Sequence, residues 1–505
     1  MSVTMPGLRA RKKAAGRPSK HLLRSPAALR TEVLAGLVVA LALIPEAIAF
    51  AVIAGVDPRV GLFSSVTMAT TIAFTGGRPA MISAATAAVA LVVAPVARDH
   101  GLAYLVATII LAGIIQMALA LFGVAKLIRF IPRSVMIGFV NALAILVFVS
   151  QVRHLLGVPW LVYPLTLVGI VVMVTLPKLT TAVPAPLVGV LLLTAAVIVF
   201  GWHVPNVGDQ GALPDSLPLP GLPHVPLALR TLQTIAPYAF GAALVGLLES
   251  LMTAKLVDEI TDTPSNKTRE AWGQGMANAV TGIFGGMGGC AVIGQTMMNI
   301  KVAGARTRLS TLLTGVFVLV LVVSLGDLVG RIPMAALVAV MVVVSATTFD
   351  WHSISPRTLK VLPRSEILIM AVTVVGTVTT RNLAIGVSLG VLTAVVAFVR
   401  RVAHFTSVET TCGRAESEAG TRTYRVHGEL FFVSSNDLIH QFDYANDPDD
   451  VVIDMSGAAV WDASSVAAID TIRHKYASRG KSVRLTGLDN VSLDRLGRLS
   501  GLLRL

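Results

Sequence analysis

Long uncharged stretches recur along the chain between about residues 31 and 403. Nineteen uncharged residues separate Arg133 from Arg153, and GLAYLVATIILAGIIQMALALFGV separates Asp99 from Lys126. A bilayer core needs about 20 apolar residues per helix, so each stretch predicts a membrane-spanning helix. The pattern predicts fourteen segments, of which two are short, at about 33–55, 60–75, 83–97, 101–124, 132–151, 160–177, 184–202, 232–256, 271–287, 290–301, 308–326, 332–347, 365–380 and 383–401.

The pattern changes near the end of the chain. Residues 421–505 contain strand-like runs such as TYRVHGELFFVS and VVIDMSG, which alternate with helix-like stretches near 464–478 and 491–503. Alternating strands and helices predict a small α/β domain. The aspartate-rich stretch DYANDPDD, residues 443–450, predicts a solvated loop.

Composition agrees with this division. The 505 residues are 54% hydrophobic and 14% charged, whereas a soluble domain is about 25% charged. This excludes an ordinary soluble enzyme and a disordered chain. The two cysteines, Cys290 and Cys412, are too few for a disulfide framework or a zinc site and are interpreted as small apolar filler.

The positive charge of +13 follows the predicted topology. Residues 1–30 hold eight basic residues and no acidic one. With the N-terminus inside, 24 Lys and Arg lie on the inner side and six on the outer side. This asymmetry predicts cytoplasmic N- and C-termini in the cell inner (plasma) membrane, and charge that reflects topology instead of nucleic-acid binding. The apolar run after the tail lacks a cleavage site, so the first helix is expected to be retained.

We expect four regions: a basic cytoplasmic tail at 1–30, a transport domain at 31–403 with repeats at about 31–202 and 232–403, a linker at 404–420, and the soluble domain at 421–505.

Two acidic residues lie well inside predicted membrane helices. Carboxylates in a bilayer are costly and are functional candidates by default. Glu46 follows Pro45, which breaks helix regularity. Glu249 precedes Thr253 by one helical turn, so the two share a helix face that suits sodium or a proton. The structural alternatives are a proline-kinked packing site at Glu46 and a buried Glu249 bonded to a neighbouring helix.

Each acidic helix is followed by a glycine-rich break and a short segment. Gly76 and Gly77 precede AMISAATAAVALVV, and the stretch 285–289 precedes CAVIGQTMMN. Interrupted segments at corresponding positions of two halves indicate an inverted-repeat transporter with its site between the repeats. Short helices that begin at mid-membrane direct their N-terminal N–H groups at that site and favour an anion. Close helix packing is the alternative explanation for each glycine cluster.

These strings resemble the SulP (sulfate permease) family, whose relatives include prestin, pendrin and cyanobacterial bicarbonate transporters. The resemblance rests on LALIPEAIAFAVIAGVDPRVGLFSS, SAATA, LLESLMTAKLVDEITDTPSNKTREAWGQGMANAVTGIFGG, NIKVAGARTRLS and VVIDMSGAAVWDASS. It implies a polytopic α-helical membrane protein of fourteen segments in two inverted seven-helix repeats, forming a core and a gate, with a cytoplasmic α/β STAS domain. Members are commonly homodimers that move sulfate, bicarbonate, chloride or dicarboxylates, coupled to protons or sodium or by exchange.

The resemblance also implies site residues. Glu249 and Thr253 match the coupling-ion position, a possible sodium site, to which Ile293 is adjacent. The implied anion contacts are Glu46, Phe50, Ala85, Thr86, Ala87, Gly294, Gln295 and Thr296, several of them through backbone amides of the short helices.

Four residues or stretches depart from the family pattern. Glu46 replaces a common Gln, Gln295 replaces a common Arg, Ile293 replaces a hydroxyl ligand, and SAATAA lacks a common Pro. The site is therefore less positive than usual. This favours proton-linked uptake of a small anion, with bicarbonate first and sulfate or a dicarboxylate next.

Other functions remain open at this point. An anion exchanger or channel, or a membrane-anchored STAS signalling protein with a cytoplasmic partner, is the alternative. Ser464 stands at the phosphoacceptor position of related STAS domains and is a candidate regulatory residue. No cofactor, enzymatic activity or nucleic-acid partner is expected beyond the small anion, the coupling ion and membrane lipid.

Overall fold

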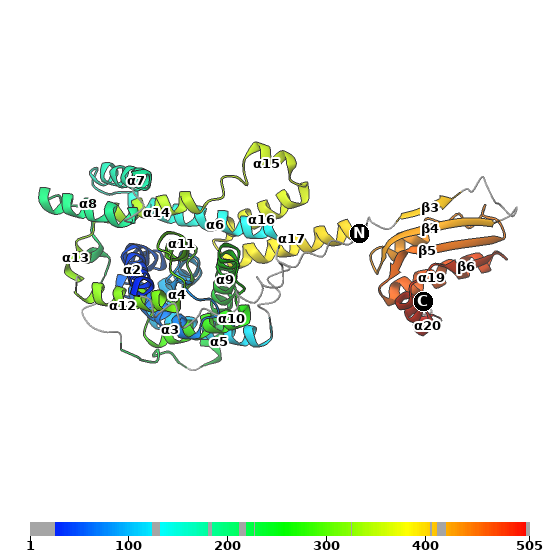
Figure 1. Ribbon diagram of the computed structural model, residues 1–505, viewed down its shortest axis with the longest axis horizontal. Coiled ribbons are helices and arrows are strands. Elements are labelled where there is room, and N and C mark those ends of the chain that lie inside the picture. The colour runs from blue at the N-terminus through cyan, green and yellow to red at the C-terminus, as the bar shows by residue number, and fades with distance from the viewer. Residues whose placement is uncertain are drawn as a thin grey trace. The chain divides into compact units, whose positions relative to one another are not determined.

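The computed structural model describes residues 26–123, 132–179, 184–211, 219–226, 228–324, 326–403, 407–411 and 421–500. The chain divides into two compact units, residues 1–391 and 392–505 (Figure 1). Most of the basic tail and most of the predicted linker lie outside the described residues, as do Lys126 and Arg129 of the topology count.

Helices occupy all of the predicted membrane segments in the described chain. In order they are α2 (Pro26–Ala54), α3 (Pro58–Thr75), α4 (Ala87–His100), α5 (Leu102–Leu121), α6 (Arg133–Val152), α7 (Val162–Leu179), α8 (Ala185–Phe200), α9 (Leu229–Thr261), α10 (Lys267–Ile283), α11 (Ile293–Met297), α12 (Arg308–Ser324), α14 (Met334–Thr348), α16 (Arg364–Thr380) and α17 (Leu383–Ala403). A π-helical turn, Met298–Val302, continues α11. Short helices α13 (Gly326–Gly330) and α15 (Pro356–Val361) lie in connections.

Six of the described helices are long and apolar enough to cross a membrane: α2, α5, α6 with the turn that follows it, α7, α9 and α17. Three more, α8, α12 and α14, are apolar but shorter. The chain is therefore a helical membrane protein, and the count of fourteen crossings stays a prediction.

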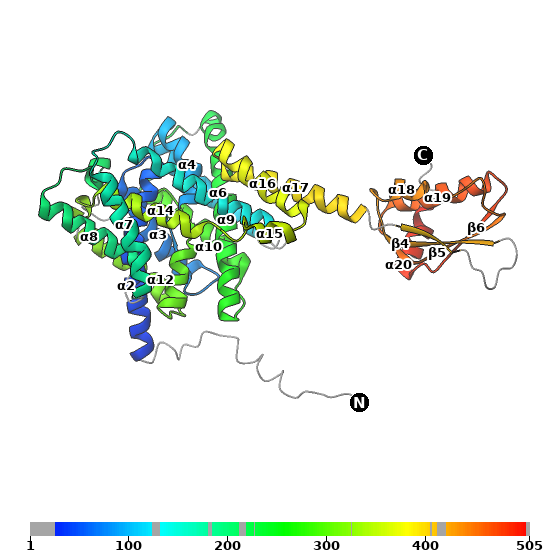
Figure 2. The same cartoon turned by 90° about the horizontal axis from the view of Figure 1, so that it is seen from above.

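The membrane helices form two bundles. In the first, the core bundle, α3 and α2 pack against α12, and α5 packs against α10 and α9. In the second, the gate bundle, α6 packs against α16, and α14 packs against α6, α7 and α8. Helix α2 also contacts α14, which joins the bundles. The core bundle thus draws its helices from both halves of the sequence (Figures 1 and 2).

Two short strands cross at the centre of the core bundle. Strand β1 (Ser83–Ala84) pairs antiparallel with β2 (Cys290–Ala291), and Ser83 lies opposite Ala291. Each strand immediately precedes one of the two short helices, α4 or α11. The pairing satisfies the backbone groups that interrupted helices would otherwise leave unbonded inside a membrane. It also brings the starts of α4 and α11 together.

The second unit carries a four-stranded sheet in the order β3-β4-β5-β6. Strand β3 (Ser407–Thr411) is antiparallel to β4 (Thr421–Leu430), whereas β4, β5 (Asp450–Val460) and β6 (Ser482–Thr486) are parallel. Helices α18 (Ser435–Ile439), α19 (Ala463–Ala477) and α20 (Asn490–Leu499) complete it. Alternating apolar residues of β4 and β5 form its core with α19, as the strand–helix alternation predicts.

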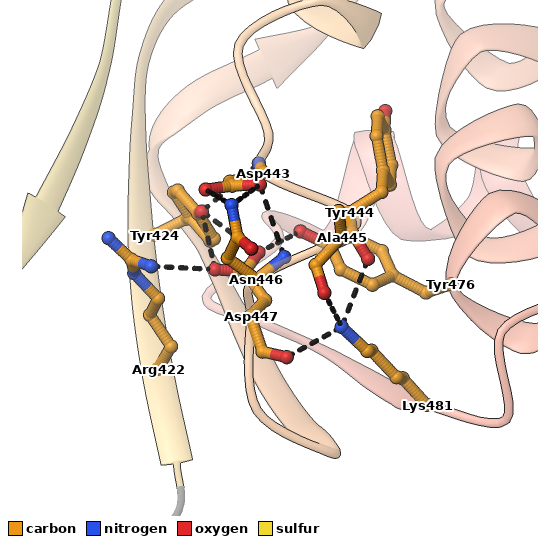
Figure 3. A network of polar contacts seen from close by, with 9 residues as sticks. All are labelled: Arg422, Tyr424, Asp443, Tyr444, Ala445, Asn446, Asp447, Tyr476 and Lys481. Atoms are coloured by element: carbon orange, nitrogen blue, oxygen red, sulfur yellow. Dashed lines mark hydrogen bonds and ion pairs between the residues drawn. The ribbon is translucent and has the colours of Figure 1, made fainter.

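The aspartate-rich stretch 443–450 is only partly the solvated loop expected from sequence. The Asp447 side chain is fully buried and accepts hydrogen bonds from Tyr424 Oη at 2.9 Å, Tyr476 Oη at 2.5 Å and Arg422 at 2.9 Å (Figure 3). Lys481 Nζ donates to the backbone carbonyls of Tyr444, Ala445 and Asp447. The loop is fixed in place because the Asp447 carboxylate and the three backbone carbonyls face inward and accept hydrogen bonds from these donors.

This tyrosine cluster predicts a loss of stability at alkaline pH. Burial raises the pKa of Tyr444 to about 12, and burial together with Asp447 raises the pKa of Tyr476 further. An unfolded tyrosine ionises near about pH 10, so stability is constant below that pH and falls as pH rises through the folded pKa values. A fragment of residues 407–505 should unfold at lower urea at about pH 11 than at about pH 9. An unchanged urea midpoint would contradict this.

Candidate functional site

A cavity of about 260 Å³ lies where the core and gate bundles meet. The first turns of α4 and α11, the middle of α2 and α9, and the facing sides of α6 and α14 form its wall. Eight of the residues predicted from sequence reach it: Glu46, Phe50, Thr86, Ala87, Glu249, Ile293, Gly294 and Gln295. Residues more than 200 positions apart therefore meet at one site, although their role in binding stays a prediction.

Glu249 is connected to the start of α4 through a cysteine. Cys290 Sγ donates to Glu249 Oε2 at 2.9 Å and lies 3.1 Å from Thr86 Oγ1. Thr86 is the N-cap of α4, where its hydroxyl accepts from the Val89 amide. The carboxylate, thiol and hydroxyl thus form one chain that joins α9, β2 and α4. Interpreting Cys290 as apolar filler was incomplete, because the β1–β2 pairing places its thiol between two polar groups.

Glu46 and Gln295 form the second polar pair of the cavity. The Gln295 side-chain amide donates to Glu46 Oε1 at 2.7 Å, and Gln295 is 2% exposed. The other polar atom of this side chain, Gln295 Oε1, has no hydrogen-bond partner in the structure. Both residues depart from the family pattern noted in the sequence, and the structure shows that they depart together, as hydrogen-bonded neighbours.

Three of the predicted residues do not line the cavity. The Thr253 hydroxyl donates to the Glu249 backbone carbonyl at 2.8 Å, instead of facing the carboxylate. The Ala85 amide donates to Ser65 Oγ at 3.3 Å. The Thr296 hydroxyl accepts from the Ile82 amide at 3.0 Å. Thr253 follows the common pattern in which a helical threonine bonds back to the preceding turn, whereas Ala85 and Thr296 bond to other segments of the core bundle.

Polar residues missed in the sequence hold the second glycine-rich break and the strand that follows it. The Asn278 side chain donates to the Gly289 carbonyl at 3.0 Å and accepts from the Gly289 amide at 2.9 Å. Ser64 Oγ accepts from the Met287 amide at 2.7 Å, and Ser250 Oγ accepts from the Ala291 amide at 3.1 Å. A polar side chain on an apolar helix was the available signal, but only the fold shows which backbone group it meets.

In the described part of the membrane domain two further carboxylates are buried, beyond the pair singled out from sequence. Glu270 is fully buried, and its Oε2 accepts from the amides of Gly77 at 2.7 Å and Arg78 at 2.9 Å. Glu32 is 2% exposed and accepts from backbone amides at the start of α12, including Arg306 at 2.7 Å. Both lie just outside the predicted segments. They bond to otherwise unpaired N–H groups, which explains their burial structurally.

In the second unit, Ser464 is exposed in the first turn of α19. Asp462 caps this helix by accepting from the Ser465 amide at 2.9 Å, and it also accepts from the Phe432 amide at 2.7 Å. The neighbouring Ser465 is buried. The regulatory role of Ser464 stays a prediction.

Comparison with known proteins covers both units. Residues 29–163 and 159–373 match the Sulfate permease family, and residues 414–504 match the STAS domain. YbaR of Bacillus subtilis (strain 168), whose name proposes sulfate transport, is 49% identical over 464 residues, which are 92% of this chain and 95% of YbaR.

More distant relatives share the fold. The bicarbonate transporter BicA of Picosynechococcus sp. (strain ATCC 27264 / PCC 7002 / PR-6) is 24% identical over 93% of this chain and 91% of its own. The structure of the murine Solute Carrier 26 family member A9 anion transporter superposes with a TM-score of 0.80 at 17% identity, covering 99% of this chain and 92% of the other.

Proposed function

Because this chain belongs to the sulfate permease family, a family of transporters and not of enzymes, we propose that it is a secondary active transporter that carries small anions by alternating access. The observation that carries the proposal is the central cavity. Two buried carboxylates from α2 and α9 line it together with the starts of α4 and α11. Movement of the core bundle against the gate bundle would open this cavity to each side in turn.

The anion binds at the start of α4 in this proposal. The first amides of a helix have no intrahelical partner, and Ala87 and Ala88 at this position line the cavity. Thr86 adds a hydroxyl, and Phe50 adds an apolar face. The side-chain amide of Gln295, on α11, donates a hydrogen bond to Glu46, which fixes its orientation in the cavity wall.

Proton coupling is favoured over sodium coupling by the ligands present. A sodium ion needs several oxygen ligands, yet Ile293 supplies no side-chain oxygen and Thr253 is not among the residues that line the cavity. A proton needs only one carboxylate oxygen. When Glu249 or Glu46 carries a proton, the cavity loses a negative charge and can accept an anion at lower electrostatic cost.

The substrate is proposed to be a small anion with low charge, bicarbonate before sulfate or a dicarboxylate. Among the described residues, no lysine or arginine lines the central cavity. A dianion would therefore gain less here than a monoanion. We further propose a homodimer, with both termini on the cytoplasmic side of the inner membrane.

Uptake by proteoliposomes tests this function. Bicarbonate, sulfate, chloride and fumarate are supplied in turn under a proton gradient, a sodium gradient or neither, with protein-free vesicles as the control. We expect bicarbonate uptake to follow the proton gradient. Large electrical conductance without coupling would instead identify a channel, and anion binding without uptake a sensor.

Replacement of Cys290 tests the polar chain at Glu249. Cys290→Ser keeps a donor between Glu249 and Thr86 and should retain transport, whereas Cys290→Ala removes it. A hydrogen bond to a charged group contributes about 1.5–3 kcal/mol, so the alanine variant should lose about tenfold or more in initial uptake rate. Equal rates in the two variants would show that the thiol only fills space.

A further inference from the structure

A second cavity, of about 550 Å³, lies between the two bundles and contains three guanidinium groups. Arg98 at the end of α4, Arg153 after α6 and Arg381 in the α16–α17 turn all line it. Tyr238 and Asn382 add a hydroxyl and an amide. Among the described residues, no aspartate or glutamate lines this cavity.

The second cavity lies one helical turn beyond the central cavity. On α2 the central cavity is lined by Phe50 and the second by Ile53. On α4 the corresponding residues are Ala88 and Leu91. On α6 the two linings interleave, since Val147 lines the central cavity and both Leu146 and Ser150 line the second.

The steps on α2 and α4 are each three residues in the same chain direction. At a rise of about 1.5 Å per residue, the nearest lining residues of the two cavities are about 4.5 Å apart along these helix axes. The two cavities are therefore consecutive compartments on one path, separated by a single layer of side chains.

The three arginines differ in how they are held. Arg381 is exposed, has a left-handed backbone (φ 53°), and makes no hydrogen bond or ion pair with any residue that the structure describes. Arg98 pairs with Asp99 at 3.3 Å, but both side chains are more than half exposed, so this pair neutralises little of the local field. Arg153 donates to the Val52 carbonyl at 2.7 Å and keeps its charge without a carboxylate partner.

Acidic groups near the cavity do not cancel this charge. Asp57 lines a neighbouring cavity that shares Arg153, and it already pairs with Arg59 at 3.4 Å. Three positive groups around a partly enclosed volume raise the local concentration of anions, because low-dielectric walls focus the field.

We propose that this arginine-lined cavity is a second anion site, an antechamber that collects small inorganic anions before they pass the single layer of side chains into the central cavity. The antechamber takes anions of charge −1 or −2 without selecting their shape, since guanidinium groups on separate helices attract negative charge. Discrimination between different anions takes place in the central cavity. The inference rests on the proposed function for its direction: the antechamber faces the side opposite the chain termini.

The rate at which charged reagents modify a cysteine in the cavity wall tests whether the antechamber accumulates anions, and this measurement does not require transport. Ser150→Cys in a Cys412→Ser background places a thiol in the cavity wall, and Cys290 is buried. Whole cells are treated from outside with an anionic (sulfonatoethyl) or a cationic (trimethylammonium-ethyl) methanethiosulfonate. We expect the anionic reagent to react about tenfold faster, relative to the same pair of rates on a free thiol, and the advantage to shrink at high salt.

Charge removal identifies the groups responsible. Arg98→Gln with Arg381→Gln should reduce the preference for the anionic reagent to the part that Arg153 alone supports, and external sulfate should slow modification less than in the protein with all three arginines. Arg331→Gln is the matched control, because Arg331 is exposed and lines a different cavity. This variant should change neither the preference for the anionic reagent nor the effect of external sulfate.

Two outcomes would overturn the proposal: no reagent preference in the Ser150→Cys protein, or a preference that loss of both arginines leaves undiminished. A preference in a protein that takes up no anion in proteoliposomes would uphold the antechamber and contradict the proposed transport function. Modification only from the side of the termini would overturn the assigned direction.

Discussion

Glu249→Gln is expected to abolish proton-driven anion uptake and to leave anion exchange intact. Glutamine has nearly the same shape as glutamate and can still accept a hydrogen bond from Cys290. It cannot take up or release a proton, so the cavity keeps one charge state throughout the transport cycle. The measurement is initial uptake into proteoliposomes with and without a proton gradient, together with exchange of labelled anion against unlabelled anion at equilibrium.

The matched control is Glu259→Gln on the same helix. Glu259 is exposed, and it lies ten residues beyond Glu249, outside the residues that line the cavity. The Glu259→Gln variant should take up anions at the rate of the unmodified protein. Gradient-driven uptake that persists in Glu249→Gln would transfer the coupling role to Glu46, the other carboxylate of the cavity, and Glu46→Gln would then have to abolish it.

Gly289→Ala is expected to disrupt the centre of the membrane domain. A Cβ atom at this position would overlap the backbone carbonyl of Ala84 on the paired strand β1. A backbone atom cannot rotate away as a side chain can, so the strands would have to separate, and the starts of α4 and α11 with them. Forced overpacking costs about 3 kcal/mol or more at such a site. Thermal unfolding in detergent should therefore occur at lower temperature, and uptake should be lost.

Gly294→Ala supplies the comparison for stability. The same methyl group, five residues along the chain, would meet no atom within 4 Å. The melting temperature of the Gly294→Ala variant should equal that of the unmodified protein. If both variants melt alike, the close approach of β1 and β2 is not what requires glycine at position 289.

The order of elements could be predicted from the sequence because it depends on local patterns. Uncharged stretches correspond to membrane helices wherever the structure describes them, and the strand–helix alternation after residue 420 corresponds to most of the second unit. That unit also contains strand β3, Ser407–Thr411, in the stretch expected to be a linker. Segment ends differ mostly by a few residues. At two of these ends, Glu32 and Glu270 enter the helices and are buried, because each carboxylate accepts hydrogen bonds from backbone amides contributed by another part of the chain.

The residues that line the cavity could also be predicted in part from the sequence. Glu46 and Glu249 stand out in sequence because charge is scarce in the membrane segments, and both reach the cavity. Thr253 was paired with Glu249 by helical spacing alone, and in the structure its hydroxyl donates to the Glu249 backbone carbonyl, while its role in ion binding stays a prediction. Spacing determines that two residues share a face of a helix, but the hydroxyl rotates to the nearest carbonyl of its own helix.

The sequence by itself determined the membrane character, the division into two units and the candidate acidic residues, since these follow from hydropathy and from the rarity of charge. Tertiary structure alone decided which polar groups meet. Cys290 reaches Glu249 because β2 packs against α9, and Gln295 reaches Glu46 because α11 packs against α2. The three arginines of the antechamber likewise come from the C-terminal ends of three different helices, α4, α6 and α16. Such contacts depend on how helices pack against one another, and no local pattern encodes that packing.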